Sequence, residues 1–256
     1  MKEIIINKLK EIEQGENIKI LLAVESGSRA WEFASPDSDY DVRFIYVRPE
    51  NFYLKLDKTK DVIELPINDE LDINGWDLKK ALTLLHGSNP TLFEWLSSPI
   101  VYCNTGYFEK YRDVVNSCFS PKKSLYHYLH MAENNNREFL SGDIVKLKKY
   151  FYVLRPVLAC RWILNRNSQP PMLFSELVKE ELPKDIESDV QRLLEIKINT
   201  PEVKEINRVE KVNKYLENSI ADIKQTLSCL PPEEDRQWNV LNKMFLSALD
   251  LYSKQT

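Results

Sequence analysis

The sequence predicts an α+β protein in which a compact α/β segment is followed by an all-helical C-terminal segment. Two short apolar runs at residues 18–24 and 41–48, separated by a turn of small residues, are typical of buried strands. In the second half of the chain, apolar residues recur almost throughout at helical spacing. We therefore expect one domain over residues 1–105 and a helical domain over residues 106–256.

The bulk composition is that of a soluble globular protein. The chain has 256 residues, of which 43% are hydrophobic and 29% charged. A net charge of −4 argues against a generally basic nucleic-acid-binding surface, although a local basic groove is compatible with it. No apolar run reaches the length of a membrane span, and the N-terminus lacks the apolar stretch of a signal peptide. The four cysteines are scattered without metal-ligand spacing, so we expect a cytoplasmic protein with no membrane partner.

The first elements are predicted in the order helix, strand, short helix, strand. Residues 2–14 place isoleucine and leucine at helical spacing. The strand at 18–24 leads through a Ser-Gly-Ser turn into a short helix at 26–30. Turn-forming residues at 36–38 then precede the strand at 41–48.

A third strand and an amphipathic helix follow. Asp72 lies between Leu71 and Ile73, so on a strand its side chain faces away from both apolar neighbours. Residues 78–86 have the apolar spacing of a helix, and Asp77 immediately before them is best explained as its N-cap. Asp72 is therefore the better candidate for chemistry.

The C-terminal segment is predicted to consist of helices. Paired prolines separate several of them, and Pro156 is expected to kink the strongest one. The expected helices cover residues 107–119, 124–140, 143–165, 174–181, 184–227 with an interruption near residue 200, and 234–252.

Two aspartates at the start of the second strand indicate a metal site. Asp39 and Asp41 are separated by one residue, so on a strand their side chains project to the same face. Two neighbouring carboxylates repel each other and need a cation or a shared proton. Carboxylate pairs are what Mg²⁺ selects, usually with waters and substrate phosphates as its remaining ligands.

A glycine-containing turn and a third acid complete the candidate site. Gly27 lets the backbone approach a phosphate closely, and the amide hydrogens of the short helix after it point outward. Asp72 could hold a second metal and accept the proton of an attacking hydroxyl, although Glu70 or Asp77 could be the third acid instead. Two metals bridged by carboxylates stabilise the attacking and leaving oxygens of a nucleotidyl displacement.

These motifs and their order resemble the polymerase-β-type nucleotidyltransferase superfamily. The chain has Gly-Ser-x-Ala at residues 27–30, Ser-Asp-x-Asp at residues 38–41 after an interval of seven residues, and an acid between apolar residues at 71–73. The resemblance covers roughly residues 18–165 and is closest to bacterial and phage predicted nucleotidyltransferases linked to RNA repair.

The resemblance implies a small mixed sheet flanked by helices, a two-metal Mg²⁺ site, and a nucleoside triphosphate as substrate. It assigns Asp39, Asp41 and Asp72 to the metal and to catalysis. It assigns Gly27 and Ser28 to the phosphates. Arg29 is either a second phosphate contact or an ordinary surface residue, and Ser38, directly before the acids, is a further candidate. These nucleotide-binding candidates are Gly27, Ser28, Arg29 and Ser38.

Further cations are candidates for substrate contact. Arg43 follows Asp41 at strand period and shares its face, so it could neutralise the acids without metal or touch the substrate. On the helix expected at 143–165, Lys148, Tyr152 and Arg155 share one face, which suits phosphates and stacked bases. The alternative for this face is a solvated stripe whose aromatic residues lie in the core.

One position departs from the family pattern. Many relatives carry a glycine two residues after the alanine of Gly-Ser-x-Ala, where this chain has Glu32. If that position requires a positive φ, a glutamate there costs about 1 kcal/mol. The substitution touches none of the expected metal ligands.

The sequence thus predicts a Mg²⁺-dependent nucleotidyltransferase that transfers a nucleoside monophosphate to a hydroxyl acceptor and releases pyrophosphate. An RNA end is the favoured acceptor, and a small molecule or a protein is the alternative. A second alternative is a weakly active nucleotide-binding regulator, for which Glu32 is the hint.

Overall fold

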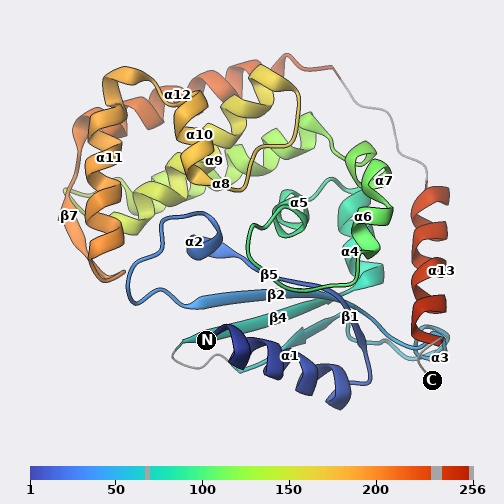
Figure 1. Ribbon diagram of the computed structural model, residues 1–256. Helices are drawn as coiled ribbons and strands as arrows, with labels where there is room; N and C mark the ends of the chain where they lie inside the picture. The colour runs from blue at the N-terminus through green and yellow to red at the C-terminus, as the bar shows by residue number, and fades with distance from the viewer. Residues whose placement is uncertain (67–69, 232–237, 254–256) are drawn as a thin grey trace. The chain divides into compact units, whose positions relative to one another are not determined.

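The computed structural model describes residues 1–66, 70–231 and 238–253, and the chain forms two compact units (Figure 1). The first unit comprises Met1–Gly27, Asp39–Cys118 and Asp235–Thr256, and the second comprises Ser28–Ser38 and Phe119–Glu234. The architecture is α+β, which confirms the predicted fold class. The predicted domain boundary at residue 105 divides the chain once, whereas each of these units combines segments that alternate along the chain.

The first unit contains a five-stranded mixed sheet. Its strands are β1 (Lys19–Glu25), β2 (Tyr40–Val47), β3 (Val62–Glu64), β4 (Leu71–Asp77) and β5 (Val101–Asn104). The strand order is β3-β4-β2-β1-β5, in which β2 and β4 are parallel and every other neighbouring pair is antiparallel. The predicted strands at 18–24, 41–48 and around Asp72 are thus present to within one residue at most of their ends.

Helix α1 (Lys2–Gly15) covers one face of this sheet (Figure 1). Ile5, Leu9 and Ile12 recur at helical spacing on its buried side. They pack in one core with alternate residues of β2, including Phe44 and Tyr46. The strand residues between these apolar ones therefore face the opposite side of the sheet.

The other helices of this unit are short, apart from the last. Trp76 of β4 packs against Trp95 at a ring-centroid distance of 3.9 Å, and Tyr107 donates a hydrogen bond to the carbonyl of Met244 at 2.5 Å. The second contact ties the C-terminal helix to this unit. These helices are α3 (Glu50–Tyr53), α4 (Leu78–His86), α5 (Pro90–Leu96), α6 (Tyr107–Lys110), α7 (Arg112–Ser117) and α13 (Asn239–Ser253).

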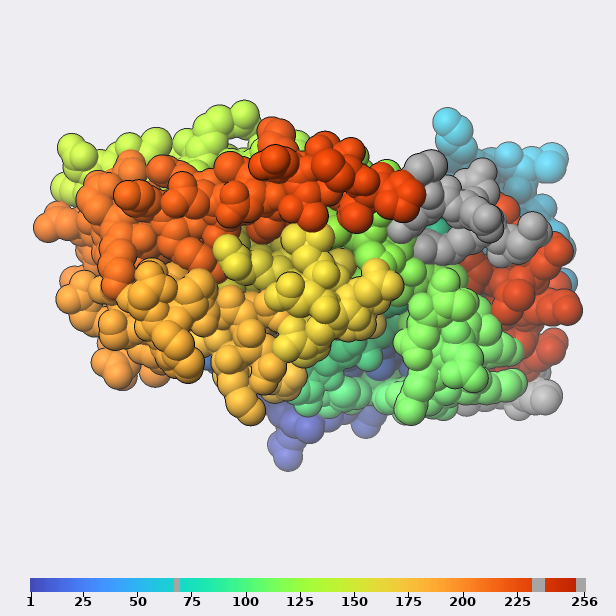
Figure 2. Space-filling model, turned by 90° about the horizontal axis from the view of Figure 1, so that it is seen from above, coloured from blue at the N-terminus to red at the C-terminus, as the bar shows by residue number. Residues whose placement is uncertain are grey.

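The second unit is mainly helical. It contains α8 (Pro121–Phe139), α9 (Leu147–Arg166), α10 (Phe174–Glu181), α11 (Lys184–Asn199) and α12 (Glu210–Ser228), with a two-stranded sheet of β6 (Ile144–Lys146) and β7 (Glu205–Asn207). Figure 2 shows α12 lying along one face of this unit, beside α11. No helix in the described part of the chain is long and apolar enough to cross a membrane.

Two predicted helix starts are wrong, and each has a local cause. Helix α8 begins at Pro121 rather than residue 124, because the hydroxyl of Ser120 caps it by accepting the Lys123 amide at 3.0 Å. Helix α9 begins at Leu147 rather than residue 143, because residues 144–146 pair with β7 instead. The predicted helix at 234–252 lies partly outside the described residues, and α13 covers the remainder.

The segment of residues 28–38 belongs to the second unit. It leaves the short helix α2 (Gly27–Ala30) and places Phe33, which is fully buried, in the helical core. The Phe33 ring lies 5.2 Å from Phe151 and 5.5 Å from Phe174. An aromatic anchor therefore holds the chain between the two motifs of the candidate site.

Candidate active site

Asp41 and Asp72 lie directly opposite each other on neighbouring parallel strands of the first unit. Both side chains are on the sheet face that points away from the α1 core, as the alternation around Asp72 predicts. One nitrogen of Arg43, Nη2, donates to Asp41 Oδ1 at 2.9 Å and to Asp72 Oδ2 at 2.7 Å. The two carboxylates thus converge on a single positive group.

Arg43 is held firmly in this position. Its other terminal nitrogen, Nη1, donates to the backbone carbonyls of Asp72 at 3.0 Å and Val42 at 3.2 Å. The Arg43 side chain is 18% exposed, and the two carboxylates are only partly exposed. Arg43 therefore neutralises the acid pair in this structure, which is one of the two roles expected from its place on the strand.

Gly27 is required by the position of the Asp41 carboxylate. Its φ is +61°, in the left-handed region that favours glycine. A Cβ atom at this position would lie 2.1 Å from Asp41 Oδ2. The adjacent Ser26 amide donates to the Asp41 carbonyl at 2.8 Å, so the turn and the acid strand are joined by backbone as well.

Glu25 is a site residue that the sequence analysis missed. Its side chain is fully buried, and one carboxylate oxygen accepts the Asp41 amide at 2.8 Å while the other accepts the hydroxyl of Tyr102. The Ser98 hydroxyl donates to the Glu25 carbonyl at 2.6 Å. The available signal was a charged residue directly after the apolar run of residues 20–24 and directly before the glycine turn.

The donor set fits Mg²⁺ in part. Asp39 is exposed and lies one residue before β2, and within the described residues no group of three or more His, Cys, Asp or Glu side chains is placed to hold a metal. Two converging carboxylates nevertheless suit a magnesium ion whose other ligands are waters and phosphate oxygens. Because Arg43 occupies the point of convergence, its guanidinium has to move before a metal binds both acids.

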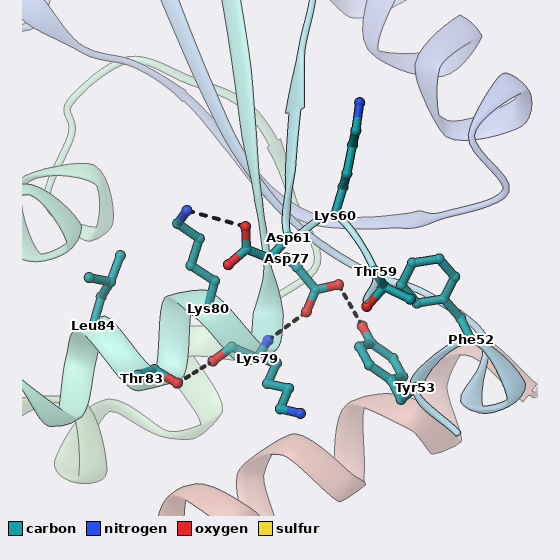
Figure 3. Close-up of a pocket in the computed structure, with 10 residues that line it drawn as sticks. All are labelled: Phe52, Tyr53, Thr59, Lys60, Asp61, Asp77, Lys79, Lys80, Thr83 and Leu84. Carbon is teal, nitrogen blue, oxygen red and sulfur yellow. Dashed lines mark hydrogen bonds and ion pairs between the residues drawn. The ribbon is translucent and has the colours of Figure 1, made fainter. Parts of the chain in front are cut away.

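Asp77, the alternative third acid, has a structural role at the far end of β4 (Figure 3). Its Oδ1 accepts the Lys79 amide at 2.8 Å, which confirms the predicted N-cap of α4, and its Oδ2 accepts the Tyr53 hydroxyl at 2.8 Å. The carboxylate is 2% exposed at the edge of a cavity of about 340 Å³. Burial raises the pKa of Asp77 above its ordinary value of 3.8, although both hydrogen bonds oppose the shift.

Replacing Asp77 tests this assignment through stability. Asp77→Ala removes the cap and leaves the Tyr53 hydroxyl without its acceptor, so we expect the free energy of unfolding to fall by about 1–3 kcal/mol. Asp77→Asn keeps the cap and should lower the free energy of unfolding by less. Since the protonated carboxyl is favoured in the folded state, its contribution is complete below pH 3.8 and is lost as the pH rises through the raised pKa.

Urea unfolding at several pH values measures both effects. The stability of the wild type relative to Asp77→Asn should decline as the pH rises from 3.8. Asp61→Asn, which alters an exposed aspartate at the same cavity, is the matched control and should change stability by less than about 0.5 kcal/mol. A constant difference between wild type and Asp77→Asn across this range would contradict the account.

Three of the predicted nucleotide-binding residues belong to the second unit, where they stabilise the segment of residues 28–38. Arg29 Nη2 donates to the Ser38 carbonyl at 2.5 Å, and the Phe33 amide donates to the Ser28 carbonyl at 3.0 Å. The Ser38 hydroxyl donates to Glu202 at 2.6 Å and accepts the Ser35 amide at 2.9 Å. Their contact with a nucleotide stays a prediction.

Glu32 has the backbone conformation that the family glycine suggests. Its φ is +71°, a strained value for a residue with a Cβ atom. The Glu32 carboxylate accepts the hydroxyl of Ser175, and the Phe174 amide donates to the Trp31 carbonyl at 3.2 Å. Contacts with the start of α10 therefore hold the segment in place despite the strain.

The cation and aromatic face of α9 is engaged within the second unit. Arg155 is 3% exposed, with its guanidinium 4.5 Å from the centre of the Trp31 ring. Tyr152 meets the edge of the same ring at 6.4 Å, and Lys148 forms an ion pair with Glu202 at 2.7 Å. Substrate contact by these three residues is not tested by this geometry and stays a prediction.

The chain is similar to a known protein over nearly its whole length. An uncharacterized protein of Bacillus subtilis (strain 168), YcgL, is 44% identical over 252 residues, which is 98% of this chain and 97% of the relative. The crystal structure of a nucleotidyltransferase-like protein from Exiguobacterium sibiricum 255-15 covers 88% of this chain and 74% of its own, at 11% identity and a TM-score of 0.32. The second likeness is too weak to carry an argument.

A protein family matches nearly the whole chain. The family described as the RNA repair pathway DNA polymerase beta family matches residues 1–247. That match includes the glycine turn, the paired aspartates and Asp72, the three motifs on which the resemblance to polymerase-β-type nucleotidyltransferases depends. With the fold and these motifs together, the chain belongs to the RNA repair pathway DNA polymerase beta family.

Proposed function

We propose that this protein is a magnesium-dependent nucleotidyltransferase that moves a nucleoside monophosphate from a nucleoside triphosphate to a hydroxyl group on an RNA end. One observation carries the proposal: the carboxylates of Asp41 and Asp72 converge on one cationic group, the Arg43 guanidinium. A carboxylate pair that already accommodates positive charge suits Mg²⁺. Membership of the family supports the same reaction.

In the proposed reaction, the acceptor oxygen forms a bond to the α-phosphorus of the triphosphate. The bond from that phosphorus to the oxygen bridging it to the β-phosphate breaks, and pyrophosphate leaves. Asp39, Asp41 and Asp72 would hold the metal, and Asp72 would also take the proton of the acceptor hydroxyl. Magnesium, when bound, supplies positive charge at the attacking and leaving oxygens.

We assign the triphosphate to the turn that begins at Gly27. The positive φ of Gly27 and its lack of a side chain let phosphate oxygens approach the backbone. Ser28 contributes its amide and hydroxyl, and Arg29 contributes positive charge. The Ser38 hydroxyl, which donates to Glu202 in this structure, would complete the set of phosphate contacts by donating to a phosphate oxygen instead.

The choice of acceptor rests on the family and not on a surface of the protein that would bind it. The family description names an RNA repair pathway, which favours an RNA end over a small molecule or a protein. RNA binding should weaken steeply as salt rises, whereas binding of a small acceptor should not. We expect the reaction in the cytoplasm, where the four free cysteines stay reduced.

A second candidate function is a nucleotide-binding regulator with little turnover. Two observations favour it: Arg43 occupies the point between the acids, and Glu32 adopts a strained conformation in the turn region. Such a protein would bind ATP and Mg²⁺ without releasing pyrophosphate on any acceptor.

One experiment separates the candidates. The purified full chain is incubated with Mg²⁺, each labelled nucleoside triphosphate and RNA, DNA, small-molecule or protein acceptors, and labelled product and pyrophosphate are measured. Incorporation into RNA with stoichiometric pyrophosphate supports the proposal. Triphosphate binding by calorimetry without pyrophosphate release on any acceptor supports the regulator.

The role of Arg43 gives a prediction about metal affinity. Arg43→Gln removes the positive charge between Asp41 and Asp72, so Mg²⁺ no longer competes with it. We expect the dissociation constant for Mg²⁺ to fall about tenfold, allowing for partial exposure of the site. Isothermal titration calorimetry with Mg²⁺ alone measures this, and Arg112→Gln on α7, an exposed arginine, is the control. Weaker Mg²⁺ binding in Arg43→Gln would contradict the competition.

A further inference from the structure

The side chain of Glu25 supplies one of the hydrogen bonds that fix the start of strand β2. The Ser26 amide donates to the Asp41 carbonyl at 2.8 Å, and the Asp41 amide donates to Glu25 Oε1 at 2.8 Å. In a regular antiparallel pair, two opposite residues exchange both of these bonds through their backbones. Here a carboxylate is the second acceptor, at the point where the chain leaves β1 and enters the Gly27 turn.

Glu25 is itself held by residues in and before β5. Its second carboxylate oxygen, Oε2, accepts the hydroxyl of Tyr102. Its carbonyl accepts the Ser98 hydroxyl at 2.6 Å, and its amide donates to the Ile100 carbonyl at 2.9 Å. The backbone and both carboxylate oxygens of Glu25 are therefore bonded, which restricts where the carboxylate can lie.

The contact with Asp41 is direct and lies within the first unit. The amide nitrogen that Glu25 accepts is separated from the Asp41 side chain only by the α-carbon. Asp41 in turn is paired in register with Asp72, and its carboxylate accepts Arg43 Nη2 at 2.9 Å. A shift of the Asp41 backbone would therefore move its carboxylate relative to Asp72.

A fully buried carboxylate is a costly acceptor for one backbone amide. Burying a carboxylate is unfavourable unless hydrogen bonds compensate for it, and a neutral acceptor would satisfy the Asp41 amide at a lower cost. Glu13 makes the same kind of bond at the other end of β1, where its Oε1 accepts the Ile20 amide at 2.8 Å. The Glu13 side chain, however, is 29% exposed and lies 3.4 Å from Lys19 Nζ.

Resting on the proposed function, we propose that Glu25 is a positioning residue for Asp41, and that Tyr102 and Ser98 act through it. The Glu25 carboxylate fixes the backbone of Asp41, so that the Asp41 carboxylate stays opposite Asp72 when Mg²⁺ replaces Arg43. In this role Glu25 is not a ligand of the metal and does not contact the nucleotide.

Three variants test the positioning role. Glu25→Ala removes both side-chain bonds, Glu25→Gln keeps an oxygen that can accept the Asp41 amide, and Tyr102→Phe removes only the donor to Oε2. Exchange of the Asp41 amide with solvent is followed by NMR on the full chain. Mg²⁺ affinity is measured by calorimetry without nucleotide, and stability by unfolding in urea.

Two control variants remove bonds of the same kinds elsewhere in the first unit. Glu13→Ala removes the glutamate that accepts the Ile20 amide, about 16 Å along β1 from Glu25. Tyr111→Phe removes a tyrosine hydroxyl that donates to Ser247 Oγ at 2.6 Å. Both should lower stability and leave Mg²⁺ affinity unchanged, so they separate a general loss of stability from a loss of position.

We expect the Asp41 amide to exchange faster in Glu25→Ala, because its acceptor is gone. We also expect Mg²⁺ to bind about tenfold more weakly, since residues that support metal ligands typically contribute about 10- to 100-fold to affinity. Glu25→Gln should restore most of this affinity, and Tyr102→Phe should show a smaller loss than Glu25→Ala.

Unchanged Mg²⁺ affinity in the folded Glu25→Ala variant would overturn the positioning role. An equal loss of affinity in Glu13→Ala or Tyr111→Phe would do the same. If Glu25→Ala does not fold, Tyr102→Phe decides through the same measurements, and unchanged exchange and affinity there count against the role. A wild type that binds Mg²⁺ but releases no pyrophosphate on any acceptor would overturn the proposed function alone.

Discussion

Asp41→Asn and Asp72→Asn should each lower the rate of nucleotidyl transfer by about 10³-fold or more, equivalent to about 4 kcal/mol of lost transition-state stabilisation. Asparagine keeps the size of each side chain, so the loss comes from the missing negative charge at the metal site. The two carboxylates share Arg43 Nη2 at 2.9 and 2.7 Å, so removing either one also leaves Arg43 with a single carboxylate partner. Labelled monophosphate incorporation into RNA measures the effect.

The control for these variants is Asp113→Asn, which neutralises an exposed aspartate on α7 in the same unit. It should keep wild-type activity. A double variant, Asp39→Ala with Asp41→Ala, that kept full activity would exclude this site as the catalytic centre. Circular dichroism of each variant establishes that the loss of activity occurs in folded protein.

Gly27→Ala is the second change for which a large effect is expected. The new Cβ would lie 2.1 Å from Asp41 Oδ2, and alanine at a φ of +61° is strained. We expect the free energy of unfolding to fall by about 2–4 kcal/mol, from the conformational cost together with the steric overlap. Displacement of the Asp41 carboxylate should also lower activity about 100-fold.

Gly106 offers a control that separates the two causes. Its φ is +76°, but a Cβ atom there would meet nothing within 4 Å. Gly106→Ala should therefore lower the free energy of unfolding only by the conformational cost of alanine at a positive φ, about 1–2 kcal/mol, and leave activity unchanged. Equal losses of stability and activity in the two variants would show that contact with Asp41 does not explain the need for Gly27.

Local sequence patterns were sufficient to predict much of the structure of the first unit. Strand alternation predicted that Asp72 faces away from Leu71 and Ile73, and a capping preference predicted the role of Asp77. Both predictions depend on residues within a few positions of each other. The positive φ of Glu32 meets the condition that the family glycine raised for that position, which is knowledge of the family and not of a local pattern.

Helix ends were less predictable, because they depend on partners outside the local window. Residues 144–146 have apolar spacing compatible with a helix, but they pair with β7, some 60 residues later in the chain. The inclusion of residues 28–38 in the second unit also depends on distant partners, because Phe33 packs on Phe151 and Phe174.

The sequence by itself determined the family motifs, the alternation of the acid strands and the mixed α and β character of the chain. Periodicity and turn chemistry depend on residues that are close together in the sequence, so they can be recognised without knowing which distant residues are in contact. Only the tertiary structure decided that Asp41 and Asp72 pair in register around Arg43, that Glu25 accepts the Asp41 amide, and that Glu202 accepts the Ser38 hydroxyl. These contacts join residues up to 164 positions apart, and no local pattern encodes which distant side chain will satisfy a buried hydrogen-bonding group.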